Sequence, residues 1–584
     1  MQLLEVQVML KRVFSYMREY KKYAWLGLLC IGVEVVLEIT VPLLMADLID
    51  YGVTNADGTY IIKKSMQMAL CAVLALILGV GSAKFSALAG QGLGANIRKA
   101  EYEKLQSYSF SNIDHFSVSS LVTRLTSDVT NIQNVVSTGM RPFGRSPVML
   151  IFATSFAFRI NSTLALVFLV ALPTLAVLLI LIIINVGPLY GRMQSAIDQV
   201  NRCIQENLTA IRVVKSYVRG DYEVEKFGVV NENLKSESEK AFGTAVLNMP
   251  AMQFVMYGTI LGILLIGGRL INEGQMMIGQ LTSFLSYVLL ILNSLMMMSN
   301  VFLLMTRSLA SAERIMEVID EKIDITDENA KDIAVAKGEI EFDHVWFKYK
   351  DTAKEYVLSD VSFHIKPGQT VGIIGQTGSS KTTLVQLIPR LYDVTKGEVK
   401  IDGINVKEYP VRHLRDAVAM VLQKNTLFSG SLIDNLRWGN ENATLDEIKE
   451  ACQIACVDEF VDRLADGYDT GMGQEGVNVS GGQKQRICIA RAILKKPKVL
   501  ILDDSTSAVD TATEAKIRSG LAEKLPDMTK IIIAQRISSI ENADQIIVLD
   551  DGHMAGIGTH KELMANCEVY QQIARSQLSE EELA

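Results

Sequence analysis

The residues with the clearest chemistry lie in one glycine-rich stretch, residues 371–384, which reads VGIIGQTGSSKTTL. A short β-branched run ends in a turn that is followed by Lys381, two threonines and an apolar helical pattern. Backbone N–H groups in such a turn converge on phosphate oxygens. Lys381 is placed to reach the β- and γ-phosphates, and the Thr382 hydroxyl is placed to ligate Mg²⁺. The motif departs from its usual form at Ser380, where the pattern has glycine.

A second apolar run, residues 498–503, ends downstream in Asp503. A buried strand would deliver this carboxylate beside a Mg²⁺ ion held by Thr382. A strand that ends in aspartate is common by itself, but together with the lysine loop it predicts a site for ATP and Mg²⁺. The loop residues assigned to ATP are Gly375, Gln376, Thr377, Gly378, Ser379, Ser380, Lys381, Thr382 and Thr383.

Length and composition indicate what must position this site. The chain has 584 residues, too many for a single core, and its 49% hydrophobic residues are clustered. The net charge of −8 gives no reason to expect a nucleic-acid partner. The seven cysteines are scattered, and we interpret them as reduced packing residues.

Six apolar stretches before residue 310 are long enough to cross a lipid bilayer. They lie at residues 24–45, 66–88, 147–158 with an upstream extension, 164–184, 252–270 and 278–304. The loops after the second and fourth stretches are long, polar and basic. Because positive charge marks the cytoplasmic side, both long loops and both termini are predicted to be cytoplasmic.

Polar and methionine side chains inside these stretches mark a candidate substrate cavity. Glu34 and Glu38 are four residues apart and share one helix face. They form either a patch that attracts cationic substrates or, as is more common, a cavity lining or an interhelix ion pair. Met297 lies in a run of three methionines, which suits repacking around varied apolar ligands, although core packing explains most of such a run.

The composition changes after the last apolar stretch. Residues 321–337 are charged and lack apolar periodicity, which indicates a linker. Strand-like runs then alternate with helical segments, which predicts a mostly parallel sheet covered by helices. These runs lie at residues 338–342, 371–375, 498–504, 530–534 and 545–552. The predicted organisation is a transmembrane domain at 1–320, a linker at 321–337 and a nucleotide-binding domain at 338–584.

A further motif carries a resemblance to a known family. Residues 479–483, VSGGQ, are similar to the LSGGQ signature of ABC transporters. Tyr349 lies where that family stacks an aromatic ring on adenine, and Gln423 stands at its Q-loop. The signature residues are Val479, Ser480, Gly481, Gly482 and Gln483, and the D-loop residues are Ser507, Ala508, Val509 and Asp510. Residues 120–133 and 206–220 are similar to the two cytoplasmic loops of ABC exporters, so the resemblance covers nearly the whole chain.

The resemblance implies an all-α domain of six transmembrane helices followed by an α/β P-loop nucleotide-binding domain. It implies that two half-transporters pair and enclose two ATP molecules, with Mg²⁺ held by Thr382, Gln423 and Asp503. Each signature then contacts the ATP held by the partner. By family analogy, the implied substrate is an amphipathic drug, lipid or peptide, and the location is a bacterial plasma membrane.

Two positions depart from the family pattern at the catalytic centre. Asp504 stands where the family has its general-base glutamate, and Gln535 stands where it has its switch histidine. This combination resembles the degenerate-site chain of a heterodimeric exporter, whose partner carries the missing glutamate and histidine. The alternatives are an ATP-binding membrane sensor without transport and a homodimeric exporter.

Overall fold

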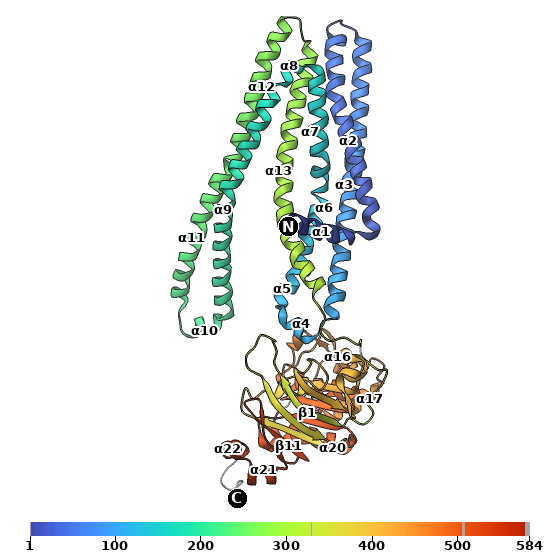
Figure 1. Ribbon diagram of the computed structural model, residues 1–584, viewed down its shortest axis with the longest axis vertical. Helices are drawn as coiled ribbons and strands as arrows, with labels where there is room; N and C mark the ends of the chain where they lie inside the picture. Colours follow the sequence, from blue (N-terminus) through green and yellow to red (C-terminus); the bar gives the residue numbers. More distant parts are fainter. Residues whose placement is uncertain (1, 329, 505–508, 578–584) are drawn as a thin grey trace. The chain divides into compact units, whose positions relative to one another are not determined.

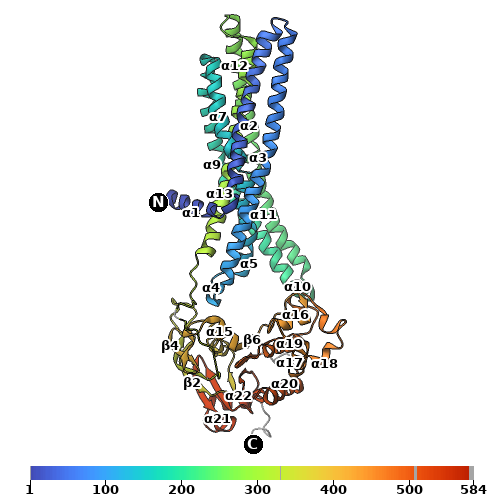
Figure 2. The same cartoon turned by 90° about the vertical axis from the view of Figure 1, so that its right-hand side faces the viewer.

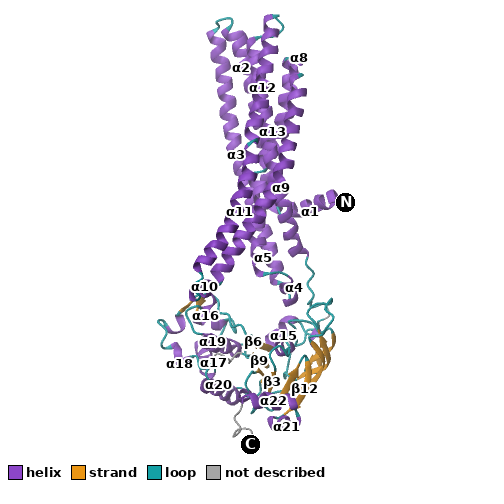
Figure 3. Cartoon of the chain, turned by 90° about the vertical axis from the view of Figure 1, so that its left-hand side faces the viewer, coloured by secondary structure: helices purple, strands orange, loops and turns teal. Residues whose placement is uncertain are grey.

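The computed structural model describes residues 2–328, 330–504 and 509–577. The chain divides into two compact units. The first comprises Met1–Gln106 and Ser119–Asp320, and the second comprises Ser107–Val118 and Glu321–Ala584. Among the described residues, the first unit is helical, and the strands all belong to the second (Figures 1 and 3). The short segment that separates the two parts of the first unit therefore packs with the second unit.

The described part of the first unit consists of long helices with short ones between them. Their bounds are α1 Gln2–Ser15, α2 Lys21–Asp47, α3 Gly58–Gln106, α5 Val118–Thr123, α6 Val129–Ser137, α7 Met140–Ile160, α8 Ser162–Ala165, α9 Val167–Thr209, α10 Ile211–Ser216, α11 Gly220–Val246, α12 Asn248–Asn272 and α13 Ile278–Asp320. Single-turn segments lie at Arg18–Tyr20, Leu48–Val53 and Arg124–Asp128.

The six predicted apolar stretches fall in α2, α3, α7, the α8–α9 pair, α12 and α13. Among the described residues, four helical stretches are long and apolar enough to cross a membrane. These are Arg18–Val53, Gly58–Gln106, Gly220–Asn272 and Ile278–Leu295, and Ser162–Leu178 is a shorter apolar helix. The fifth predicted stretch lies within α12, and α11 continues directly into α12, so one helical run, Gly220–Asn272, leads from the second basic loop into this stretch.

The core of the first unit lies where α2, α7 and α13 meet. Val35 and Ile39 are spaced one turn apart on α2 and pack in the same cluster as Met149, Phe284 and Tyr287. The Tyr287 hydroxyl is buried and donates a hydrogen bond of 2.7 Å to the Ile39 carbonyl, so its one polar atom is satisfied. In contrast, α9 and α11 pair with each other and form an arm that ends at α10 (Figure 1).

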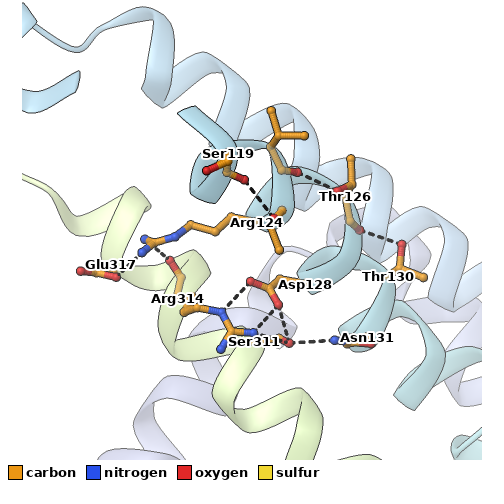
Figure 4. A network of polar contacts seen from close by, with 11 residues as sticks. Ser119, Arg124, Thr126, Asp128, Thr130, Asn131, Ser311, Arg314 and Glu317 are labelled. Carbon is orange, nitrogen blue, oxygen red and sulfur yellow. Dashed lines mark hydrogen bonds and ion pairs between the residues drawn. The ribbon is translucent and has the colours of Figure 1, made fainter. Parts of the chain in front are cut away.

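A polar network fixes the lower part of α13 to the segment around α6 (Figure 4). Asp128 is 2% exposed and accepts hydrogen bonds of 2.8 Å from Ser311 Oγ and from Arg314 Nε. Arg124 pairs with Glu317 at 2.7 Å and donates to the Arg314 carbonyl. Because Asp128 has several donors, its buried charge is compensated.

The second unit is built on two main sheets and a two-stranded ribbon. The strands are β1 Ile340–Phe347, β2 Leu358–Ile365, β3 Thr370–Gly375, β4 Lys396–Ile401, β5 Ile404–Asn405, β6 Val418–Val421, β7 Gly430–Ser431, β8 Gly471–Met472, β9 Val499–Asp503, β10 Thr529–Ile533, β11 Gln545–Asp550 and β12 His553–Gly558. The helices are α4 Phe110–His115, α14 Lys381–Gln386, α15 Val411–Ala417, α16 Leu432–Arg437, α17 Leu445–Ile454, α18 Asp458–Val461, α19 Gly481–Leu494, α20 Thr511–Lys524, α21 His560–Asn566 and α22 Glu568–Gln577.

The larger sheet has the strand order β12-β11-β3-β10-β9-β6. Its strands pair in parallel except for β12, so the predicted mostly parallel sheet is confirmed. The prediction did not separate out residues 338–342, which enter β1 of an antiparallel sheet with the order β2-β1-β4-β5. A short apolar run has the same sequence pattern in a parallel and in an antiparallel sheet, because only the direction of the neighbouring strands differs.

Side-chain alternation along the parallel strands separates two hydrophobic cores. On β9, Leu500 and Leu502 pack in the cluster formed with α16, α17, α19 and α20. Val499 and Ile501 pack in the other cluster, with Leu384 of α14 and the antiparallel sheet. Figure 2 shows α17, α19 and α20 together on one side of β6, with β2 and β4 on the other. The sheet is therefore covered on both faces, as parallel sheets require.

The polar network on α13 generates a stability prediction. Replacing Asp128 with Asn leaves Arg314 without its carboxylate, so we expect thermal unfolding in detergent to show a loss of ~1–3 kcal/mol. Glu232→Gln is the matched control, because Glu232 and Lys235 form an exposed pair on α11. The control should change stability by less than ~1 kcal/mol. Equal losses in the two variants would contradict a stabilising role for the network.

Candidate nucleotide-binding site

Three parallel strands bring the predicted site residues to one edge of the sheet. Ile533 of β10 pairs with Ile373 of β3 on one side and with Asp503 of β9 on the other. The loops that follow these strands therefore start side by side. They carry the glycine-rich turn, Asp504 and Gln535.

The glycine-rich turn at residues 375–380, which we call the phosphate loop, has a backbone conformation that explains its residue types. A Cβ on Gly375 would lie 2.1 Å from the Leu549 carbonyl oxygen, so only glycine fits there. Gly378 has φ of +88°. Ser380 also has a left-handed backbone, with φ of 68° and ψ of 23°. A side chain in that region costs about 1 kcal/mol relative to glycine, so Ser380 retains the turn at some cost in strain.

Lys381 lies over this turn. Its ammonium donates hydrogen bonds of 2.9 Å to the Gly375 carbonyl and 2.8 Å to the Gln376 carbonyl. Burial lowers the pKa of Lys381, while the carboxylates of Asp504 and Asp503 oppose that shift. The ammonium is thus held at the mouth of the turn, where phosphate oxygens of a nucleotide would meet it.

Asp503 and Thr382 form an oxygen pair suited to a magnesium ion. Thr382 Oγ1 donates to Asp503 Oδ1 at 3.0 Å. The second carboxylate oxygen, Oδ2, is buried and has no hydrogen-bond partner within the described parts of the chain. Burial raises the pKa of Asp503. Hydroxyl and carboxylate oxygens are ligands that Mg²⁺ prefers, and it usually completes its shell with water and phosphate. These residues therefore fit the ion, which would neutralise phosphate charge there.

Asp504 and Gln535 contact each other directly. Gln535 Nε2 donates a hydrogen bond of 2.7 Å to Asp504 Oδ2. Burial raises the pKa of Asp504, and the hydrogen bonds from Gln535 and Gln423 oppose that shift. The Gln535 amide therefore binds one oxygen of the Asp504 carboxylate.

These groups share one pocket of about 530 Å³. Its lining comprises Gly375, Gln376, Thr377, Gly378, Ser380, Lys381, Thr382, Thr383, Gln423, Asp503, Asp504, Ile533, Gln535, Ile573, Ser576 and Gln577. The last three come from α22 and were missed by the sequence analysis. The sequence around them indicates a helix but gives no sign of which surface that helix covers. Ser379 is buried beneath the turn.

Tyr349 lies at the border of this site. Its hydroxyl is 2.8 Å from Thr383 Oγ1, and its ring meets Tyr392 edge to face with centroids 5.2 Å apart. Tyr392 in turn donates a hydrogen bond of 2.6 Å to Asp114 of α4. Phe110 of α4 packs edge to face on the same tyrosine. A continuous set of contacts thus runs from the phosphate loop to α4.

The signature residues lie outside the pocket. Ser480 is exposed and caps α19, and it exchanges hydrogen bonds with Gln483 in a capping box. Gly481 is also exposed, and Val479 is buried beneath them. This surface is open to a ligand that the chain's own phosphate loop does not hold. In the D-loop, Val509 is buried and Asp510 caps α20, whereas Ser507 and Ala508 lie outside the described residues.

The transmembrane candidates Glu34 and Glu38 line a cavity of about 850 Å³ in the first unit. Glu34 pairs with Arg141 of α7 at 2.6 Å, and Glu38 pairs with Arg145 at 2.6 Å. These contacts support the ion-pair interpretation over a patch of free negative charge. Met297 is not among the described residues that line this cavity. A neighbouring cavity of about 330 Å³ is instead lined by Met249, Met252 and Met256 among other residues.

Comparison with known proteins agrees with this geometry. Residues 24–295 match the model of the ABC transporter transmembrane region, and residues 358–507 match that of the ABC transporter domain. The chain is 38% identical to an uncharacterized ABC transporter ATP-binding protein, YfiB, of Bacillus subtilis, over 98% of this chain and 99% of the relative. The chain is an ATP-binding membrane protein by fold and site. It belongs to the ABC transporter family, as an exporter-type half-transporter.

Two further relatives have more specific names. A putative multidrug export ATP-binding/permease protein, YgaD, of Bacillus subtilis is 32% identical over 95% of this chain and 97% of its own length. An ATP-dependent lipid A-core flippase of Pseudomonas putida is 32% identical over 95% and 94%. A solved bacterial Atm1-family ABC exporter with ATP bound shares the fold, with a TM-score of 0.80 and 24% identity over 96% of this chain and 99% of that one.

These findings confirm the predicted fold class, a helical transmembrane domain followed by an α/β nucleotide-binding domain. They also show that the chain is an ATPase coupled to transport. The transmembrane helices place the exporter in a membrane, with its nucleotide-binding domain in the cytoplasm.

The magnesium ligands generate a binding prediction. In Asp503→Asn, the buried Oδ2 becomes an amide or a neutral oxygen, so Mg²⁺ should no longer strengthen ATP binding. Displacement of a fluorescent nucleotide by ATP, with Mg²⁺ and with a chelator, measures this difference. Asp446→Asn, on the exposed first turn of α17, is the control and should retain the full Mg²⁺ effect. An undiminished Mg²⁺ effect in Asp503→Asn would exclude this carboxylate as a ligand.

Proposed function

We propose that this chain is the degenerate-site subunit of a heterodimeric ABC exporter that moves an amphipathic substrate. The observation that carries the proposal is the 2.7 Å hydrogen bond from Gln535 to Asp504. It joins the two positions that depart from the family pattern and places both beside Lys381 and Asp503 in one pocket.

The chemistry of this pair favours binding over hydrolysis. An aspartate is one methylene shorter than the family's glutamate, and a misplacement of about 1 Å costs on the order of 10²-fold in rate. The Gln535 amide occupies one of the Asp504 oxygens, and it carries no titratable proton of its own. The phosphate loop keeps its turn and its lysine despite Ser380, and Thr382 contacts Asp503, so ATP and Mg²⁺ are held while attack by water is slow.

The signature acts on a different nucleotide in this proposal. The exposed Ser480 and the N–H groups of Gly481 and Gly482 bind the γ-phosphate of ATP held by the partner subunit. The partner is a second half-transporter with a glutamate after the aspartate that corresponds to Asp503 and with a switch histidine. Residues 1–320 form the transmembrane domain, 321–337 the linker and 338–584 the nucleotide-binding domain.

Two features support coupling of ATP to the transmembrane helices. The contacts from Thr383 through Tyr349 and Tyr392 to Asp114 connect the phosphate loop with α4, and α4 follows α3 directly in the chain. The tip of the α9–α11 arm exposes Tyr217 and Val218 at 75% and 88%. Exposed apolar residues at a loop tip favour docking onto another surface, and here we assign the partner's nucleotide-binding domain.

The substrate class follows from the cavities of the first unit. The Glu34 and Glu38 charges are compensated by arginines, and the second cavity is rich in methionine. Such a lining suits largely apolar molecules with a polar part. The relatives named for multidrug export and for a lipid A-core flippase support the same class.

Division of labour between the two ATP sites gives one test. In the complex purified with its partner, Ser480→Ala should reduce ATP turnover more than Lys381→Ala does, because Ser480 serves the competent site. Ser431→Ala is the matched control, because Ser431 caps α16 with the same capping box but lies outside the signature. Equal loss from Ser480→Ala and Lys381→Ala would contradict the proposal. So would turnover of roughly 1 s⁻¹ or more by the chain alone.

Restoring the family residues gives a second test. Asp504→Glu combined with Gln535→His should raise hydrolysis at this chain's own site, because the general base gains reach and the switch gains a titratable group. The measurement is single-turnover hydrolysis of radiolabelled ATP. The sample is this chain assayed without the competent ATP site that the partner carries, so that only this chain's own site contributes. Unchanged hydrolysis in the double variant would show that these two side chains do not limit the rate.

A further inference from the structure

The C-terminal helix α22 reaches the nucleotide pocket through its last described residue. Gln577 Nε2 donates a hydrogen bond of 2.7 Å to the Gln535 carbonyl. Gln577 Oε1 accepts a hydrogen bond of 2.9 Å from the Ile537 N–H. One side-chain amide therefore holds the backbone on both sides of Arg536, as a neighbouring strand would. Glutamine suits this position because its amide offers a donor and an acceptor together.

The helix that carries Gln577 is itself well fixed. Tyr570 and Ala574 of α22 are fully buried in the core that includes Ile537. The Tyr570 hydroxyl lies 2.7 Å from His560 Nδ1, and Gln571 donates to the Met564 carbonyl at 2.8 Å. Gln577 thus extends from a rigid support, and Ser576 of the same helix lines the pocket.

The backbone that Gln577 holds is the one that aims the Gln535 side chain. β10 ends at Ile533, so residues 535–537 have no strand pairing of their own. Gln577 binds the Gln535 carbonyl, and the Gln535 side chain reaches Asp504. A small rotation of this backbone would move the amide away from the position of the terminal phosphate.

We propose that Gln577 is a positioning residue for the switch loop: it sets the backbone of residues 535–537 so that Gln535 can recognise the γ-phosphate of ATP. This inference rests on the proposed ATP site. It adds the C-terminal helix to the parts of the chain that distinguish ATP from ADP.

Competition binding with the full-length chain in lipid nanodiscs tests the proposal. A fluorescent nucleotide is displaced by ATP or by ADP, both with Mg²⁺. For Gln577→Ala, the preference for ATP over ADP should fall about threefold to tenfold, as expected from losing hydrogen bonds of ordinary strength. The ADP affinity should fall by less than the ATP affinity does. Gln577→Glu keeps the acceptor and loses the donor, so its preference for ATP should fall as well.

Two controls isolate the role of Gln577. Gln572→Ala removes the same side chain from the same helix, where it contacts only Glu568 in the described hydrogen bonds, and it should behave like the unmodified chain. In a Gln535→Ala background, Gln577→Ala should cause no further loss, because the two residues then act through one missing contact.

Each other outcome overturns the proposal. If Gln577→Ala has the same preference for ATP over ADP as Gln572→Ala, the two hydrogen bonds of Gln577 do not affect nucleotide recognition. Equal weakening of ATP and ADP would indicate general damage to the pocket. A loss that persists without the Gln535 side chain would exclude action through it. If the unmodified chain binds no nucleotide, the proposed ATP site itself fails, and that result is distinct from the others.

Discussion

The parallel pairing of β3, β10 and β9 is the constraint on which the nucleotide site depends. Because Ile533 pairs with both Ile373 and Asp503, the loops after the three strands leave the same edge of the sheet. That register brings a glycine-rich turn, a buried carboxylate and a switch loop into one pocket. A slip by one residue in any strand would turn its alternating side chains to the wrong core and move its loop. Packing of the two hydrophobic cores, one on each face of the sheet, therefore fixes the register of the strands. The register in turn fixes the positions of the site residues.

The partners of buried carboxylates differ between the two units, and they indicate the roles of these groups. In the first unit, Glu34 and Asp128 have arginine partners on other helices, so they connect helices without leaving free charge. In the second unit, Asp503 keeps one buried oxygen without a hydrogen-bond partner in the described chain. A buried carboxylate oxygen of that kind is costly unless a cation meets it. Glu34 also has a buried oxygen without a hydrogen bond, so the neighbours make the difference: Glu34 meets two arginines, whereas Asp503 lies beside Thr382 in the nucleotide pocket, where Mg²⁺ fits.

Much of the site could be predicted because its residues form local patterns. The phosphate loop, Asp503 and the signature each lie within a few consecutive residues, and their spacing relative to a strand or helix end is part of the pattern. Other features depend on partners distant in the chain. Arg141 contacts Glu34 across 107 residues, and Gln577 contacts Gln535 across 42. The antiparallel sheet around β1 was missed for the same reason, since a strand does not encode the direction of its neighbour.

The sequence by itself determined the class of this protein through apolar stretches of bilayer length, a phosphate loop with its lysine and threonine, an ABC transporter signature and two loops similar to those of ABC exporters. It also identified Asp504 and Gln535 as departures from the family pattern, because each departure is visible in the type of one residue at one position. Only the tertiary structure showed that the two side chains bind each other, that arginines neutralise Glu34 and Glu38, and that α22 reaches the switch loop. The physical reason is that residue type and spacing set local conformation and chemistry, whereas packing decides which distant groups come within hydrogen-bonding distance.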